Sequence, residues 1–142
     1  MADPSADLLR HVLLVEDNPD DIVLVKRAFR DQQMLDRLSV AEDGEAALAF
    51  LRREGAHANA QIPALILLDL GLPKKDGRAV LEAIRSDPAL RQIPVVITTN
   101  SRAQEDLVKS LNLNVQGYLP KPVAVEQLIT IMKGVRPPAP PA

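Results

Sequence analysis

The 142-residue chain has no cysteine and no tryptophan, and aromatic residues make up only 2% of it. Without cysteine, disulfide bonds and thiolate metal sites are excluded. So few aromatic side chains disfavour sites that stack nucleic-acid bases or a flavin ring. The net charge of -2 gives no reason to expect nucleic-acid binding. A hydrophobic content of 46% and a charged content of 25% are typical of an ordinary globular protein.

Long apolar runs are also missing. No stretch approaches the roughly 18 consecutive apolar residues that a membrane helix needs, and the first apolar run, Val12 to Val15, stops at Glu16. Asp3 and Asp7 stand where an export signal would need basic residues. We therefore expect a cytoplasmic protein without a membrane segment.

Short apolar runs alternate five times with longer segments of helical spacing. The expected strands are Val12–Val15, Leu38–Ala41, Ala64–Leu68, Pro94–Thr98 and Gln116–Leu119. This (βα)5 alternation predicts an α/β fold, a doubly wound, flavodoxin-like parallel sheet of five strands in the order 2-1-3-4-5, with helices on both faces. Because Pro120 cannot donate to a sheet ladder, the fifth strand is expected at an edge.

Helix boundaries are marked by capping residues. Asn18 can cap the first helix, with Pro19 as its first residue. Asp20 and Asp21 are explained as favourable charges at the positive helix end rather than as ligands. The other expected boundaries are Asp43 and Ser101 as N-caps of the second and fourth helices, and Ser86 and Gly134 as the ends of the third and fifth.

The chain is expected to hold one domain. We predict an N-terminal extension at 1–9, the domain at 10–135, and a Pro-rich tail at 136–142 that is extended and disordered. Residues 56–63 are predicted to form a loop.

Reactive side chains follow the carboxyl ends of several expected strands. Glu16 and Asp17 follow the first, Asp69 the third, Thr99 the fourth and Lys121 the fifth. Ligands of open α/β sheets bind at this edge, near the point where the strand order reverses. Since the first and third strands flank that point, the three acids should converge there.

Three converging carboxylates need compensation. At ~4 Å and an effective dielectric of ~20, each like-charge pair costs about 4 kcal/mol. A bound proton, a bound cation or carboxylates that point apart would each remove the cost. A hard cation such as Mg²⁺ fits best, because it prefers carboxylate, carbonyl and water oxygens. Asp69 is then the natural nucleophile for a phosphoryl group, whose oxygens Lys121 and the Thr99 hydroxyl could bind.

At this point the sequence resembles the receiver domain of two-component response regulators over about residues 10–135. The matching pieces are Leu14-Val15-Glu16-Asp17-Asn18, Leu67-Leu68-Asp69-Leu70 with Pro73 and Gly77, Thr99, and Lys121-Pro122. Their order and spacing make the resemblance specific.

The resemblance implies a role for each matching residue. Asp69 would accept a phosphoryl group from a histidine kinase in a Mg²⁺- or Mn²⁺-dependent reaction, with Lys121 as its partner. Metal ligands would be Asp17, Asp69 and the backbone carbonyl of Gly71, with Glu16 completing the acidic pocket. Thr99 would be the switch hydroxyl, Tyr118 the switch aromatic, and the Lys121–Pro122 bond cis. The protein would be a phosphoacceptor switch and no enzyme beyond its own phosphorylation and dephosphorylation.

Two segments narrow the resemblance further. The opening Val15 to Asp21 and the stretch Leu72 to Gly77 look most like single-domain regulators paired with phytochrome-type histidine kinases. Such a kinase is the expected partner, a second copy of the chain could dock, and output would pass through protein contacts. Gly71 and Asn100 depart from the residues usual at their positions, which leaves the lifetime of the phosphorylated state open.

Competing functions fit less well. A phosphatase of the haloacid dehalogenase type needs a second Asp two residues after the nucleophile, where this chain has Gly71. A flavodoxin needs a phosphate cradle after the first strand, where this chain has acids. A nucleotide hydrolase needs a Gly-rich loop followed by Lys and Ser or Thr, which is absent. A pseudo-receiver that only binds partners would not need the complete set of acids, threonine and lysine.

Overall fold

The computed structural model describes residues 9–55, 58–59, 61–70, 77–99, 103, 105–106, 109 and 114–133. They form a five-stranded sheet in the order β2-β1-β3-β4-β5, with every neighbouring pair parallel, as predicted. The strands are β1 (Val12–Val15), β2 (Leu38–Ala41), β3 (Leu65–Asp69), β4 (Val95–Thr98) and β5 (Gly117–Leu119).

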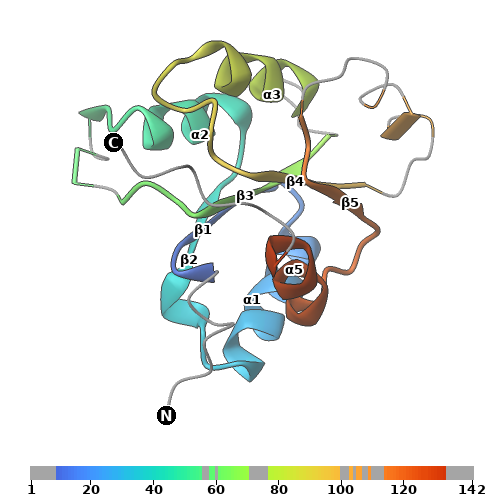
Figure 1. Cartoon of the computed structure of the whole chain (residues 1–142). Helices are drawn as coiled ribbons and strands as arrows, with labels where there is room; N and C mark the ends of the chain where they lie inside the picture. The colour runs from blue at the N-terminus through green and yellow to red at the C-terminus, as the bar shows by residue number, and fades with distance from the viewer. Residues whose placement is uncertain are drawn as a thin grey trace.

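Helices cover both faces of the sheet (Figure 1). They are α1 (Pro19–Asp31), the short 3-10 helix η2 (Leu35–Arg37), α2 (Gly44–Leu51), α3 (Gly77–Ser86) and α5 (Val125–Lys133). Figure 1 shows α2 and α3 on one face, and α1 and α5 on the other. Within the described residues, none of these helices has the length and apolar character needed to cross a membrane.

The strand bounds differ from the predicted ones by one residue at most. β1 and β2 match, whereas β3, β4 and β5 each begin one residue later than predicted. β3 also ends one residue later, so that Asp69 is itself the last residue of the strand and pairs with Thr98. The acid is therefore held by the sheet ladder rather than by a loop.

Two hydrophobic cores lie on opposite faces of the sheet, because successive side chains of a strand point to opposite sides. Along β1, Leu13 and Val15 pack into the core under α2 and α3, while Val12 and Leu14 pack into the core under α1 and α5. Burial on both faces explains why β1, β3 and β4 are nearly continuous apolar runs. The two cores give the strand ends a rigid base.

The predicted caps of the first two helices are confirmed. The Asn18 side chain accepts hydrogen bonds from the backbone N–H groups of Asp20 and Asp21 at 2.9 and 3.2 Å. The Asp43 side chain accepts one from the Ala46 N–H at 2.7 Å. The expected helix boundaries at Ser101 and Gly134 and the predicted tail at 136–142 lie outside the described residues. Leu9, at the end of the predicted N-terminal extension, is fully buried in the core under α1 and α5.

Candidate functional site

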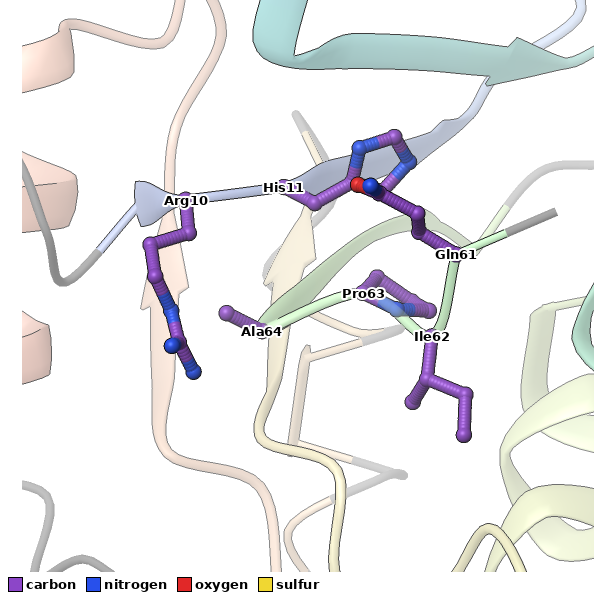
Figure 2. Close-up of a pocket in the computed structure, with 6 residues that line it drawn as sticks. All are labelled: Arg10, His11, Gln61, Ile62, Pro63 and Ala64. Carbon is purple, nitrogen blue, oxygen red and sulfur yellow. The ribbon is translucent and has the colours of Figure 1, made fainter.

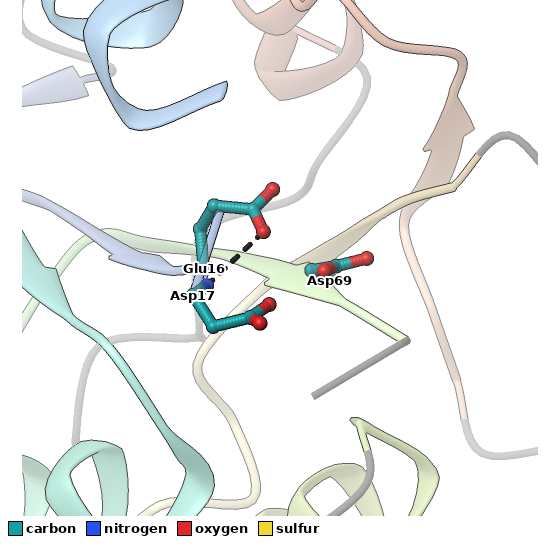
Figure 3. Close-up of side chains that lie close together, drawn as sticks. All are labelled: Glu16, Asp17 and Asp69. Carbon is teal, nitrogen blue, oxygen red and sulfur yellow. Dashed lines mark hydrogen bonds between the residues drawn. The ribbon is translucent and has the colours of Figure 1, made fainter. Parts of the chain in front are cut away.

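Three acids meet at the carboxyl edge of the sheet (Figure 3). Glu16 and Asp17 follow β1, and Asp69 ends the neighbouring strand β3. One carboxylate oxygen of each residue lies within 4.8 Å of those of the other two. The convergence predicted from the strand order is therefore present in the fold.

Glu16 is the most deeply buried of the three, with 1% of its surface exposed. Its Oε2 accepts hydrogen bonds from the backbone N–H groups of Asp17 and Asn18 at 3.1 and 3.2 Å, and its Oε1 lies 2.7 Å from Lys121 Nζ. Because both oxygens are engaged, Glu16 shapes the turn after β1 and anchors the lysine. Asp17 is more exposed than Glu16 or Asp69, which leaves its carboxylate accessible to a ligand.

Lys121 brings one positive charge to the acids from the segment that follows β5. Its Nζ lies 2.7 Å from Glu16 Oε1, 2.8 Å from Asp21 Oδ2 and 3.5 Å from Asp69 Oδ2. The Lys121–Pro122 peptide bond is cis, as predicted. One ammonium group thus faces three carboxylates at once.

The contact between Asp21 and Lys121 was not predicted from the sequence. We expected Asp21 only as a favourable charge at the positive end of α1. A signal was available in the chain order. Only three residues separate the end of β1 from the start of helix α1, so the first turn of α1 borders the same edge of the sheet as the acids.

The charges at this edge are strongly coupled. Burial raises the pKa of Glu16 to about 7; the hydrogen bond from Lys121 opposes this rise and nearby Asp69 adds to it. Burial lowers the pKa of Lys121, but the contacts with Asp21 and Glu16 outweigh burial, so that this pKa is raised overall. Lys121 therefore stays charged, while the surrounding carboxylates retain an excess of negative charge. Such a group can hold a hard cation and present one carboxylate oxygen to an electrophile.

The two threonines at the end of β4 have different surroundings. Thr99 is 8% exposed, and its backbone N–H donates to the carbonyl oxygen of Leu119 at 3.4 Å. Thr98 is 2% exposed and lines a narrow pocket together with Lys121. The Thr98 hydroxyl has no hydrogen-bond partner within the described part of the chain. Thr99 is thus tied directly to β5, the strand that carries Tyr118.

Tyr118 is half-buried on β5, where it pairs with Ile97 and packs against the core under α2 and α3. Lys109 Nζ lies over the ring, 4.9 Å from its centre, and forms an ion pair with Glu105 at 3.0 Å. Burial raises the pKa of the Tyr118 hydroxyl, Lys109 lowers it and Glu105 raises it. Gly71 and Asn100, the remaining residues singled out in the sequence, lie outside the described residues.

A second hollow lies at the opposite edge of the sheet (Figure 2). Its volume is about 580 Å³, and Arg10 and His11 before β1 line it together with Gln61 to Ala64 before β3. His11 stacks on Phe50 and contacts the Ser39 hydroxyl at 3.2 Å. None of the lining residues carries a carboxylate, so this hollow is chemically distinct from the acidic site.

The chain is similar to known proteins in both sequence and structure. The sequence pattern of the response regulator receiver domain matches residues 12–133. Response regulator Rcp1 of Synechocystis sp. is 42% identical over 124 residues, which are 87% of this chain and 84% of that protein.

Solved structures agree with this match. The bacteriophytochrome response regulator AtBRR is similar with a TM-score of 0.80 and 42% identity, over 88% of this chain and 91% of that one. The phosphorylated cyanobacterial phytochrome response regulator RcpA has a TM-score of 0.72 and 45% identity, over 89% and 90%. An Mn²⁺-bound form of response regulator Rcp1 has a TM-score of 0.71 and 42% identity, over 88% and 90%. The matched region includes the three acids, Thr99 and Lys121.

Proposed function

Because this chain belongs to the response regulator receiver domain family, we propose that Asp69 accepts a phosphoryl group and that this modification switches the protein surface. Members of this family are signalling receivers of two-component phosphorelays rather than classical enzymes. One observation carries the proposal for Asp69. Lys121 meets a cluster of carboxylates at the end of β3, with its Nζ 3.5 Å from Asp69 Oδ2.

Burial and position favour Asp69 as the acceptor over its two neighbours. It closes the central strand β3 and is 7% exposed, so its carboxylate is held rigidly at the edge of the sheet. Glu16 already uses both oxygens in the turn and with Lys121. Attack of an Asp69 oxygen on phosphorus forms the P–O bond of an acyl phosphate. The P–N bond to the donor histidine breaks, and its electron pair stays on the imidazole nitrogen. With acetyl phosphate as donor, a P–O bond breaks and acetate leaves.

The donor set fits a divalent cation, Mg²⁺ or Mn²⁺. Asp17 and Asp69 each offer a carboxylate oxygen. The backbone carbonyl of Gly71, which lies outside the described residues, would be the third ligand that the family resemblance implies. When bound, the cation would neutralise charge on the phosphoryl oxygens and help to hold them in line with the attacking oxygen. The Mn²⁺-bound form of the relative Rcp1 supports this part of the proposal.

Thr99, Lys121 and Tyr118 would convert the modification into a change of shape. The added negative charge attracts the Thr99 hydroxyl and the Lys121 ammonium toward Asp69. Because the Thr99 N–H is bonded to Leu119, a shift of Thr99 acts on β5 beside Tyr118. Tyr118 then turns into the space that Thr99 vacates, and the surface around β5 and α5 is presented differently to a partner.

The kinase partner is proposed from the relatives. AtBRR and RcpA are response regulators of phytochrome systems, so we expect a phytochrome-type histidine kinase in the cytoplasm as the donor. A second copy of the chain is a candidate partner for the switched surface.

Intact-mass measurement tests the acceptor. After incubation with acetyl phosphate and Mg²⁺, wild-type protein should gain one phosphoryl group and Asp69→Asn none. Asp36→Asn makes the same change at an exposed aspartate of η2 and should be modified like wild type. Excess chelator should suppress the adduct, and Lys121→Ala should leave Mg²⁺ binding largely intact.

An unmodified wild type, or an undiminished adduct in Asp69→Asn, would contradict the assignment of Asp69. Equal modification in chelator would contradict the metal. Transfer of labelled phosphate from a phytochrome-type kinase, compared with an unrelated kinase, tests the partner.

A further inference from the structure

Lys121 lies closer to two other acids than to Asp69, the proposed acceptor. Its Nζ is 2.7 Å from Glu16 and 2.8 Å from Asp21, but 3.5 Å from Asp69. An ammonium group has three N–H donors, so it can serve these three carboxylates at once. In this arrangement the ammonium is within ion-pair distance of Asp69 but lies nearer to Glu16 and to Asp21 of α1.

The position of Asp21 is fixed by the start of α1. Asn18 caps the helix by accepting from the N–H groups of Asp20 and Asp21, so a side-chain change at residue 21 leaves these backbone hydrogen bonds available. Asp21 is the third residue of α1, and its carboxylate reaches Lys121 across 100 residues of sequence. Unlike Glu16, it accepts no backbone hydrogen bond within the described part of the chain.

The surroundings strengthen this ion pair. The Lys121 and Asp21 side chains are 14% and 25% exposed. Both line a narrow pocket whose walls include the apolar side chains of Leu24, Val25 and Val123. Apolar walls reduce the screening by water and make the attraction between the two charges stronger than on an open surface.

We infer that Asp21 is a positioning residue that holds Lys121 back from the phosphoryl site until a phosphoryl group competes for it. This inference rests on the proposed function, since it concerns how Lys121 reaches the modified Asp69. On phosphorylation the ammonium moves from the Asp21 carboxylate to a phosphoryl oxygen, and no covalent bond of Lys121 or Asp21 changes. Asp21 thereby sets how strongly the switch resists activation, and the first turn of α1 loses an ion pair in the active state.

Beryllofluoride, a non-covalent analogue of the phosphoryl group, measures this competition directly. We would titrate it in the presence of Mg²⁺ and follow the bound species by ¹⁹F NMR. Asp21→Asn should bind it about three- to tenfold more tightly than wild type, the scale expected for loss of one partly buried ion pair. Asp21→Glu keeps the charge and should restore most of the restraint.

Asp20→Asn is the matched control. It removes the same charge from the same helix turn, but Asp20 forms no ion pair within the residues that the structure describes. It should bind beryllofluoride like wild type. An equal gain in Asp20→Asn would show a general charge effect and overturn the inference.

A double-mutant cycle tests whether Asp21 acts through Lys121. In a Lys121→Met background, Asp21→Asn should change the beryllofluoride affinity less than twofold. A gain that persists without the lysine would overturn the inference, and so would unchanged or weaker binding by Asp21→Asn in the wild-type background. Asp21→Ser repeats the test with a smaller side chain, and circular dichroism confirms that each variant is folded.

If wild-type protein shows no bound beryllofluoride, the proposed function fails and the inference fails with it. If wild type binds beryllofluoride and Asp21→Asn binds it equally well, the inference about Asp21 fails but the proposed function stands.

Discussion

At the scale of the residue, Glu16 combines two properties that oppose each other. It is buried, which raises its pKa to about 7, and it is the closest carboxylate to Lys121. In the metal-free protein the folded state therefore keeps the Glu16 proton to a higher pH than the unfolded chain does. This contribution to stability is fully present below pH 4.5, the ordinary pKa of Glu, and is lost as the pH rises through about 7.

The affinity for Mg²⁺ should depend on whether Glu16 is protonated. Below pH 7 a protonated Glu16 makes the cluster less negative, so the affinity for Mg²⁺ should rise between pH 6 and pH 8. For a single linked proton the rise is at most about tenfold. Isothermal titration calorimetry at pH 6, 7 and 8 measures it. Glu16→Gln should flatten the profile, whereas Glu82→Gln, an exposed change on α3, should leave it unchanged. A profile that is equally steep in Glu16→Gln would show that another group carries the proton.

At the scale of the element, the junction of β3 and α3 depends on a missing side chain. A Cβ atom on Gly77 would collide with the backbone carbonyl oxygen of Asp69 and would lie 2.6 Å from the Cα of Leu70. The Gly77 N–H also donates to the Leu70 carbonyl at 3.1 Å. The start of α3 is therefore pressed against the strand end that carries the proposed acceptor.

Gly77→Ala should lower the free energy of unfolding by about 1–3 kcal/mol, because neither backbone atom can move without displacing β3. It should also slow modification of Asp69 by acetyl phosphate. Gly117→Ala is the comparison, since its new Cβ would meet side-chain atoms of Ile131 and no backbone, and the nearest of them, Cδ1 at 2.8 Å, is the end of a flexible side chain that can rotate. Urea unfolding followed by circular dichroism should give a smaller loss for Gly117→Ala. Equal losses of unfolding free energy in the two variants would mean that the close contact of Gly77 with the end of β3 does not determine the cost of the substitution.

The elements themselves were predictable because their signals are local. Alternating apolar runs gave the strands to within one residue, and Asn18 and Asp43 were identified as caps from their side-chain chemistry and position. The strand order placed β1 beside β3, so the meeting of Glu16, Asp17 and Asp69 followed from the topology. The chain order places the first turn of α1 at this same edge, but the contact of Asp21 with Lys121 also depends on how closely α1 packs against the segment after β5. No pattern within either segment encodes that distance.

At the scale of the whole molecule, the edge of the sheet opposite the acids is held by one arginine. The Arg85 guanidinium, on α3, donates at 2.8 Å to the carbonyl oxygens of Arg91, Ile93 and Asn114. The side chain of Gln116, which Arg85 also contacts, accepts from the Val95 N–H at 2.7 Å. The segments that lead into β4 and β5 are thus tied to α3 at one point.

Arg85→Ala should lower the free energy of unfolding by about 1–2 kcal/mol, because three backbone carbonyl groups lose a charged donor and the bond to Ile93 is partly buried. Arg85→Lys keeps the positive charge but lacks the planar guanidinium, so its free energy of unfolding should lie between those of wild type and Arg85→Ala. Arg27→Ala, an exposed change on α1, should have little effect. At a temperature where all variants are folded, each should still take one phosphoryl group from acetyl phosphate. Loss of modification in folded Arg85→Ala would show that the two edges of the sheet are coupled.

The outermost strand of the sheet has a further consequence. β5 spans only three residues and is hydrogen-bonded to a single neighbour, β4, yet the lysine of the site lies only two residues beyond its end. The acids, by contrast, follow or end interior strands. Detachment of this border strand would carry the Lys121 ammonium away, and within the described residues it would leave the carboxylates of the site facing one another without that positive charge. Charge compensation at the site and pairing of β5 with β4 are therefore thermodynamically coupled. A ligand that binds Lys121 should also stabilise the attachment of β5 to the sheet.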